Sequence, residues 1–542
     1  MKTVGMYLAE LLEAYGVEVV FGIPGVHTVE LYRGMPNTKL RHVTPRHEQG
    51  AGFMADGYAR VSGKPGVCFI ITGPGMTNIA TAMAQAYGDS IPMLVISAVN
   101  ALGQIGSGEG WLHELQDQSQ MIGLVSEFSH TVTKPAELPK VLARAFAVFS
   151  GARPRPVHIE LPLDVITASA DGLPPVKAAT LPAAPAASPA ALRQAADLLD
   201  RARMPLLLVG GGAQDAGPFV RDIAEKLDAP VLMTVNGRGL LPPGHPLAVP
   251  ANPSMPPSIK LIEESDVILA IGTEFGPTDY DWLEQGGARF TGKSIRIDID
   301  AQQIVRSRLV DLPIVAEASE ACAALAPMLN AAPMLNAAHG RDGAGRAAMT
   351  RDKLLADLSP LYRACLHLME TTRDALPGVV LVGDSAQPVY AASVYFPSAA
   401  PRSWFTSATG YGTLGYALPA AIGAQLAAPD RPVVCVAGDG GFQFSIQELA
   451  AAREIEVPVI VLLWNNNGYG EIKNYMIARQ IHPIGVDIYT PDFQMLAKGF
   501  GCEAVKLKSP ADLPKLLREA RGRKTATIIE IDEADYVANY RG

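Results

Sequence analysis

The feature that most constrains this chain is a regular alternation of short apolar segments with stretches of helical periodicity along almost its whole length. The apolar segments are bounded by turn residues and are shorter than a buried helix, so we read them as strands. Strands that are apolar throughout are covered on both faces, and helices between them impose parallel pairing. The predicted strands are residues 17–23, 66–72, 92–99, 205–212, 230–235, 267–272, 294–300, 379–384, 433–440, 458–466 and 525–532.

Two connecting segments divide this alternation into three blocks. Residues 168–189 are rich in proline and alanine, which suits an extended linker. Residues 331–348 form the second expected linker, and they overlap a duplicated PMLNAA sequence. We therefore predict an α/β protein with three doubly wound parallel-sheet domains, over residues 1–167, 190–330 and 353–542. Ligands of such sheets bind beyond the carboxyl ends of the strands, so the residues found there are the ones to examine.

The composition excludes several classes of function. The chain has 542 residues, of which 48% are hydrophobic, so it can build sizeable cores. A formal net charge of -9 gives no global attraction to nucleic acid or to an anionic membrane. No apolar window approaches the roughly 18 residues that a membrane span requires. Five scattered cysteines indicate neither a disulfide framework nor a zinc site, and we expect a cytoplasmic protein.

The strongest chemical signal lies at two predicted strand ends in the third block. One strand ends in the sequence GDGG (residues 438–441), and the next ends in NN (residues 465–466). If these strands are neighbours, the carboxylate of Asp439 and the amide of Asn466 project from the same edge. Together with a backbone carbonyl they form an oxygen-only site, which is what Mg²⁺ requires. Gly440 and Gly441 let a phosphate group approach the backbone N–H groups.

This spaced motif resembles that of the thiamine diphosphate enzymes. The resemblance implies that the metal ligands are Asp439, Asn466 and the carbonyl of Gly468. A second motif, RHEQGAG (residues 46–52), resembles the segment in which a glutamate, here Glu48, binds N1′ of the aminopyrimidine. That hydrogen bond favours the imino tautomer, which removes the proton from C2 of the thiazolium. The alternative reading of Glu48 is a surface residue that caps a helix.

The resemblance covers nearly the whole chain and extends to the acetolactate synthase group, in the order pyrimidine-binding, central and diphosphate-binding domain. It implies that Pro74 and Asn78 lie near the cofactor and that Leu414 wedges between its two rings. The carbonyl of Gly412 would accept a hydrogen bond from the 4′-amino group. The other cofactor contacts that it implies are Gly383, Asp384, Ser385, Gly438, Gly440, Gly441 and Tyr469.

In this family the glutamate and the metal motif of one active site come from different subunits. The resemblance therefore implies self-association as an obligate dimer or a dimer of dimers. It also implies a reaction class, the decarboxylation of a small 2-oxo acid, because the thiazolium accepts the electrons that CO₂ leaves behind. The product is then released as an aldehyde or joined to a second carbonyl compound.

Several candidate catalytic residues differ from the acetolactate synthase pattern. His27 and His113 are candidates for proton transfer, and the alternative for each is a hydrogen-bonded structural role. Gln116 stands where the family has a glutamine. Glu471 follows the NN motif, and its alternative is the solvent-facing start of a helix.

Residues 21–78 and 465–493 resemble decarboxylases of 5-guanidino-2-oxopentanoate (2-ketoarginine). The resemblance implies that the products are 4-guanidinobutanal and CO₂. A guanidinium group calls for a carboxylate that can bind it in a bidentate manner. The sequence does not choose between the candidates Glu471, Glu109, Glu114 and Asp117.

Three alternatives stay open. The first is an acetolactate synthase-like carboligase with the same cofactor. The second is an FAD-linked oxidoreductase, for which residues 210–212, 272–275 and 297–300 at strand ends of the second block offer a nucleotide cradle; bound FAD is less expected than its absence. The third is a non-catalytic homologue, against which the intact Glu48, Asp439 and Asn466 argue.

Overall fold

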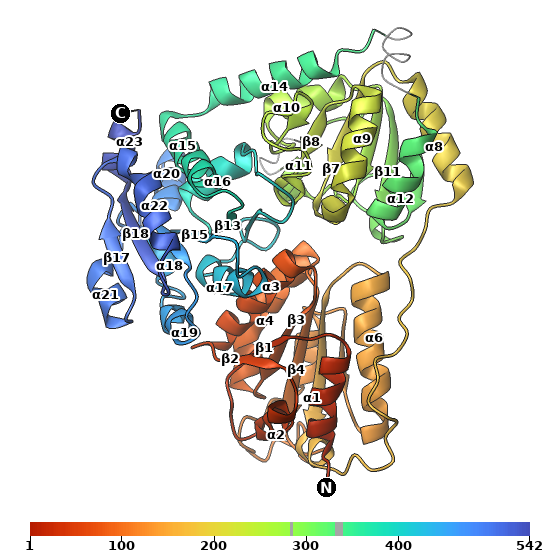
Figure 1. The fold of residues 1–542 in the computed structure, drawn as a ribbon, viewed down its shortest axis with the longest axis vertical. Coiled ribbons are helices and arrows are strands. Elements are labelled where there is room, and N and C mark those ends of the chain that lie inside the picture. Colours follow the sequence, from red (N-terminus) through yellow and green to blue (C-terminus); the bar gives the residue numbers. More distant parts are fainter. Residues whose placement is uncertain (282–285, 331–339, 542) are drawn as a thin grey trace.

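The computed structural model describes residues 1–281, 286–330 and 340–541. Its strands form three six-stranded sheets, and every strand pairing within them is parallel. Each sheet lies in one of the three predicted blocks with helices packed around it (Figure 1). The predicted fold class is confirmed, and each of the predicted strands is present within a few residues of its expected bounds.

The first sheet has the strand order β2-β1-β3-β4-β6-β5. Its central strands are buried along their whole length, which explains why they read as unbroken apolar runs. Its strands are β1 (Val19–Gly22), β2 (Arg41–Val43), β3 (Gly66–Ile70), β4 (Met93–Val99), β5 (Phe128–Thr131) and β6 (Pro156–Pro162). The helices are α1 (Val4–Ala14), α2 (Val29–Arg33), α3 (Glu48–Ser62), α4 (Pro74–Asp89), α5 (Gln118–Gly123), α6 (Leu138–Gly151) and α7 (Leu163–Ile166).

The second sheet has the order β12-β11-β10-β7-β8-β9, so the strand order reverses between β7 and β10. Its strands are β7 (Pro205–Val209), β8 (Val231–Met233), β9 (Ala248–Val249), β10 (Val267–Ile271), β11 (Lys293–Asp298) and β12 (Leu312–Val315). The helices are α8 (Pro189–Arg201), α9 (Gly217–Leu227), α10 (Pro256–Glu263), α11 (Pro277–Tyr280) and α12 (Ala318–Leu325).

The third sheet has the order β14-β13-β15-β16-β18-β17, with its reversal between β13 and β15. Its strands are β13 (Val380–Gly383), β14 (Trp404–Thr406), β15 (Val433–Gly438), β16 (Ile460–Asn465), β17 (Glu503–Lys506) and β18 (Thr527–Asp532). The helices are α15 (Pro360–Ala375), α16 (Gln387–Val394), α17 (Ala417–Ala427), α18 (Asp439–Phe442), α19 (Glu448–Glu454), α20 (Gly470–Ala478), α21 (Phe493–Gly499), α22 (Leu513–Arg521) and α23 (Glu533–Asn539).

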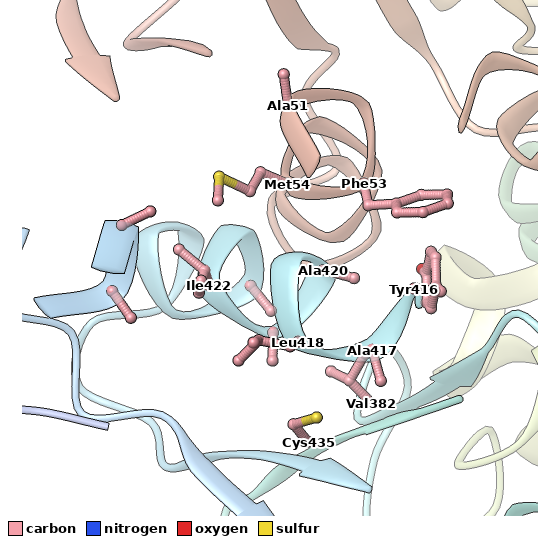
Figure 2. Packing of buried hydrophobic residues seen from close by; sticks show 14 of the residues in the cluster. Ala51, Phe53, Met54, Val382, Tyr416, Ala417, Leu418, Ala420, Ile422 and Cys435 are labelled. Atoms are coloured by element: carbon pink, nitrogen blue, oxygen red, sulfur yellow. The ribbon is translucent and has the colours of Figure 1, made fainter. Parts of the chain in front are cut away.

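The first and third domains share one hydrophobic core, which forms where α3 crosses α17 (Figure 2). The two helices touch at glycines. A Cβ atom at Gly57 would overlap the backbone carbonyl of Ala420, and one at Gly423 would overlap that of Met54. Only glycine permits this backbone separation, because any side chain would push the helices apart.

The two segments that connect the domains differ in how much regular secondary structure they contain. Between α7 and α8 the chain forms a single isolated bridge, from Ser169 to Thr3, as an extended linker would. The second predicted linker is wrong over its last residues, because residues 343–348 begin helix α14 (Gly343–Asp357). Asp342 caps that helix by accepting a hydrogen bond from Gly345 N over 3.0 Å. Residues 331–339, with the second PMLNAA copy, lie outside the described residues.

Within the described parts of the chain, no helix has both the length and the apolar character that crossing a membrane requires.

Candidate active site

Two strand ends of the third sheet lie side by side. Strands β15 and β16 pair in parallel with Gly438 opposite Trp464, so Asp439 and Asn466 leave the sheet at the same edge. The backbone N–H of Asn466 donates to Asp439 Oδ1 over 3.4 Å, and the hydroxyl of Thr490 donates to Oδ2 over 3.1 Å. The two residues of the spaced motif are therefore adjacent in space, next to the reversal of the strand order.

Both side chains at this edge present oxygen atoms without full compensation. Asp439 is 1% exposed, and burial raises the pKa of its carboxyl group. The Oδ1 atom of Asn466 is buried and has no hydrogen-bond partner. Burying a hydrogen-bond acceptor without a donor costs free energy. A cation bound to the oxygens of Asp439 and Asn466 would offset that cost. The described residues hold no group of three or more His, Cys, Asp or Glu suited to a metal, so such a cation would rely on mixed oxygen donors.

The two glycines that follow Asp439 are buried and closely packed. A Cβ atom at Gly440 would lie 2.6 Å from the ring of Tyr469. A Cβ atom at Gly441 would lie 3.0 Å from Asp384 Oδ1 and 3.4 Å from Leu414 Cδ2. A side chain at either position would press on these neighbours, so the turn after β15 requires glycine. The phosphate contact that the sequence predicts for the two glycines stays a prediction.

Asp384 organises the segment that carries Gly412 and Leu414. Its carboxylate follows β13 and accepts hydrogen bonds from Ser385 N (2.9 Å), Gly415 N (3.2 Å) and Ala417 N (3.0 Å). Burial raises the pKa of this carboxyl group, while the backbone N–H groups oppose that effect. The carboxylate thus binds the backbone of residues 415–417, directly after Leu414. The predicted contact of Asp384 with the cofactor stays a prediction.

A second cluster lies at the carboxyl edge of the first sheet. Glu48 is the first residue of α3, and its Oε2 accepts a hydrogen bond from Asn78 Nδ2 over 2.9 Å. Asn78 stands one turn after Pro74, which begins α4. A Cβ atom at Gly75 would lie 3.4 Å from Glu48 Oε1. The structure therefore brings Glu48, Pro74 and Asn78 together at the start of two helices.

Two histidines flank this cluster. The rings of His27 and His113 stack with their centroids 5.2 Å apart, and both Nδ1 atoms are buried without a partner. Burial lowers the pKa of His27, and the neighbouring His113 adds to this effect. His113 has a left-handed backbone (φ 61), and its carbonyl contacts the turn at Gly73 that precedes α4. The pair thus lies at the same sheet edge as Glu48.

Sequence comparison connects these two clusters with a known family. The models for thiamine pyrophosphate enzymes match three parts of the chain: the N-terminal TPP binding domain at residues 2–121, the central domain at 192–325 and the C-terminal TPP binding domain at 384–531. "Probable 2-ketoarginine decarboxylase AruI" of Pseudomonas aeruginosa is 45% identical over 537 residues, which is 98% of this chain and 94% of that protein. This chain is a thiamine pyrophosphate enzyme.

Other relatives of this thiamine pyrophosphate (thiamine diphosphate) enzyme are acetolactate synthases. The large subunit of isozyme 1 from Escherichia coli is 32% identical over 541 residues, covering 97% of this chain and 93% of that protein. The large subunit from Corynebacterium glutamicum is 32% identical over 543 residues, covering 94% and 83%. The predicted likeness to the acetolactate synthase group is therefore confirmed.

The sequence singles out Gln116, but the glutamine that hydrogen-bonds to the turn after β3 is Gln118. Gln116 is exposed, whereas Gln118 is buried at the start of α5. Gln118 Oε1 accepts hydrogen bonds from the Thr72 hydroxyl (2.9 Å) and from Gly73 N (3.0 Å). Gln118 thereby braces the turn before α4, a role that the glutamine-rich sequence around it does not reveal.

Glu448 is a second residue that sequence reasoning missed. It begins α19 of the third domain, is fully buried, and accepts hydrogen bonds from the backbone N–H of Arg46 at both carboxylate oxygens over 3.0 Å. Burial raises the pKa of Glu448 to about 7, with a smaller contribution from the negative charge of Glu48. Glu448 thus ties the third domain to the start of α3. Its sequence context, QEL, contains no signal for this contact.

The four candidate carboxylates for a guanidinium have different surroundings. Both Glu114 oxygens accept backbone N–H groups, from Gly108 and from Gly110 and Trp111. Asp117 Oδ1 caps α5 by accepting from Gln120 N over 2.7 Å. Glu109 is exposed and accepts from the Trp111 ring N–H over 3.2 Å. Glu471 is half-buried, near the metal motif.

The two clusters of this enzyme are not joined within the described residues. No hydrogen bond or ion pair there links the group His27, Glu48, Asn78 and His113 with the group Asp439, Asn466 and Gly468. Each cluster is bordered by exposed large apolar side chains, namely Val26, Trp111 and Leu112 at the first, and Phe444, Ile472 and Tyr475 at the second.

Proposed function

We propose that this thiamine pyrophosphate enzyme catalyses the Mg²⁺-dependent, non-oxidative decarboxylation of 5-guanidino-2-oxopentanoate to 4-guanidinobutanal and CO₂. The observation that carries the reaction class is the buried, unpartnered Asn466 Oδ1 beside Asp439, in a chain whose two cofactor-binding domains match the family. The substrate follows from the 45% identity to the protein named a probable 2-ketoarginine decarboxylase.

Magnesium would be held by Asp439, Asn466 Oδ1 and the carbonyl of Gly468, with the diphosphate completing its coordination. The packing at Gly440 and Gly441 supports this placement, because both glycines lie against Tyr469, Asp384 and Leu414, which the sequence also assigns to the cofactor. We also assign to the diphosphate Gly383 and Gly438, which end strands β13 and β15, together with Ser385 and with Tyr469, which lies against Gly440.

Glu48 would bind N1′ of the aminopyrimidine, and Asn78 would hold the Glu48 carboxylate in place through the 2.9 Å hydrogen bond. Leu414 would separate the two rings of the cofactor, and the carbonyl of Gly412 would accept from the 4′-amino group. When bound, the cofactor supplies the electron sink for the loss of CO₂. The stacked His27 and His113 would deliver the proton that completes the aldehyde; in support, both rings lie at the sheet edge of Glu48, and neither Nδ1 atom is engaged in a hydrogen bond.

The guanidinium of the substrate would pair with Glu471. Its carboxylate is half-buried between Gln387 and the Tyr362 hydroxyl, which lies 3.5 Å from Oε1. Burial raises the pKa of Glu471, and hydrogen bonds from Gln387 and Tyr362 counteract that rise. A guanidinium would compensate the buried negative charge of Glu471. Glu114 and Asp117 instead accept hydrogen bonds from backbone N–H groups of nearby residues.

A screen of 2-oxo acids with guanidino, aliphatic, aromatic and acidic side chains tests the proposal, with detection of both the aldehyde and CO₂. We expect a much higher kcat/KM for 5-guanidino-2-oxopentanoate than for pyruvate. Comparable turnover of both acids, with acetolactate accumulating, would instead favour the acetolactate synthase-like carboligase, which the relatives at 32% identity support.

We also propose a dimer or a dimer of dimers in which the two clusters meet across the subunit boundary. Two observations support this assembly: no hydrogen bond joins the two clusters within the described residues, and large apolar side chains near each of them are exposed. Sedimentation velocity measures it, and a monomer with full activity would exclude it. A cytoplasmic location is proposed on the five free, buried cysteines.

FAD has a candidate location but no assigned role in this reaction. A cavity of about 570 Å³ lies between the three domains, beyond the reversal point of the second sheet. Residues 210–212, the turn at Gly272 and Asp298 line it, as does Arg153, whose Nη1 is buried without a partner. Because the proposed decarboxylation is non-oxidative, it needs no flavin. A visible absorption spectrum of the purified protein decides whether FAD is bound.

A further inference from the structure

The two asparagines that end β16 are held in different ways. Asn465 uses both ends of its amide: Nδ2 donates to Glu530 Oε1 over 2.9 Å, and Oδ1 accepts from Asn467 N over 3.1 Å. Asn466 uses only its nitrogen end, which donates to Glu533 Oε2 over 3.0 Å and to Gln387 Oε1 over 3.1 Å. Its oxygen end has no partner.

The acceptors around Asn466 fix the direction of its amide. An ionised carboxylate only accepts hydrogen bonds, so a flipped amide would place Oδ1 against the oxygens of Glu533 and Gln387. The flipped amide would also place its NH₂ group where the unpartnered oxygen now lies. Two acceptors from separate elements, α16 and α23, therefore select the orientation in which the nitrogen is bound and the oxygen is left without a hydrogen bond.

The orientation of Gln387 is itself determined by its neighbours. Gln387 Oε1 also accepts from the Trp464 ring N–H over 3.2 Å, and the Gln387 side chain donates to Glu471. Reversing the Gln387 amide would set donor against donor at Asn466 and acceptor against acceptor at Glu471. The chain of hydrogen bonds thus runs from Glu471 through Gln387 to Asn466 and has consistent directions throughout.

We propose that Glu533 and Gln387 are positioning residues that hold the Asn466 oxygen toward magnesium, and that Glu471 extends this control to the substrate pocket. The inference rests on the proposed magnesium site. The partners of metal-binding side chains tune metal affinity because they fix the direction of the ligand atom. The C-terminal helix α23, which contributes Glu533, thereby belongs to the metal site although it supplies no ligand.

The test is calorimetric titration of Mg²⁺ into the full-length protein with saturating thiamine diphosphate. We expect Glu533→Ala and Gln387→Leu to raise the Kd for Mg²⁺ by roughly 10- to 100-fold. Glu533→Gln keeps one acceptor oxygen and should recover most of the affinity. Equal loss in Glu533→Ala and Glu533→Gln would show that charge and not orientation matters, and would overturn the proposal.

Glu530→Ala is the matched control, because Glu530 holds the neighbouring Asn465 in the same manner but faces no ligand. It should lower the melting temperature without changing the Kd for Mg²⁺, and an equal loss of affinity in Glu530→Ala would overturn the proposal. Wild-type affinity in Glu533→Ala would do the same. If the unaltered protein binds thiamine diphosphate equally well without Mg²⁺, the proposed metal site fails first, so the two failures are distinguishable.

Discussion

The two halves of the proposed active site differ in how many contacts hold their side chains. At the edge of the third sheet, Asp439 and Asn466 are each fixed by side chains from other elements. At the edge of the first sheet, the stacked His27 and His113 have unpartnered ring nitrogens, and the loop beyond them is largely exposed. The difference indicates that the proposed metal-binding edge is held by more side-chain contacts than the edge that carries the two histidines.

The largest effect is expected at the proposed metal-binding edge. Asp439→Ala should abolish Mg²⁺-dependent binding of thiamine diphosphate, because losing the charged ligand leaves the diphosphate poorly neutralised. Calorimetric titration measures this binding, and Asp374→Ala, at an exposed ion pair of the same domain, is the control. If Asp439→Ala binds thiamine diphosphate with unchanged affinity, the assignment of Asp439 to the cofactor site is wrong.

At the edge of the first sheet, Glu48→Gln should bind the cofactor normally but lower kcat by about 10²- to 10⁴-fold, since it removes proton transfer and not binding. The exchange of the C2 proton of the bound cofactor, followed by NMR, should slow in parallel. Asn78→Ala, which releases the Glu48 carboxylate, should give a smaller loss of kcat. Near-normal turnover by Glu48→Gln would refute the assigned role.

A smaller effect is expected on substrate selection by Glu471. Glu471→Gln should lower kcat/KM for 5-guanidino-2-oxopentanoate about 10- to 100-fold, because a charge-assisted hydrogen bond contributes about 1.5–3 kcal/mol. Turnover of an uncharged aliphatic 2-oxo acid should be unaffected, and Mg²⁺ affinity nearly so, since glutamine still accepts from Gln387. Glu109→Gln serves as the control. A uniform loss for both substrates would assign Glu471 to the scaffold.

The smallest effect concerns pH. His158 lies on β6 of the first sheet and forms hydrogen bonds with Ser97 and Ser129, and burial lowers its pKa to about 3. A histidine in the unfolded chain has a pKa of about 6.5. The neutral ring therefore stabilises the fold above that pH, and this contribution is lost as the pH falls toward 3, by about 1.4 kcal/mol per unit. His158→Gln should flatten the pH dependence of thermal melting below about 6.5; an unchanged slope would contradict this account.

The sequence predicts the sheets and the strand-end motifs because apolar runs and parallel pairing determine both. It does not predict Gln387 and Glu533 as partners of Asn466, since these residues come from separate elements and their contacts exist only after the sheet assembles. Gln118 escaped notice for the same reason. Residues 343–348 read as a flexible linker because they are rich in glycine and alanine, yet Asp342 and tertiary packing make them helical.

The glycine contact between α3 and α17 has a consequence for how this polypeptide can be divided. Because Gly57 and Gly423 bring the two backbones together inside one shared core, the N-terminal and C-terminal segments matched by the family are not separable modules. Expressing residues 1–167 alone would leave the face that α17 covers open to water, and such a fragment should aggregate unless residues 353–542 are supplied with it.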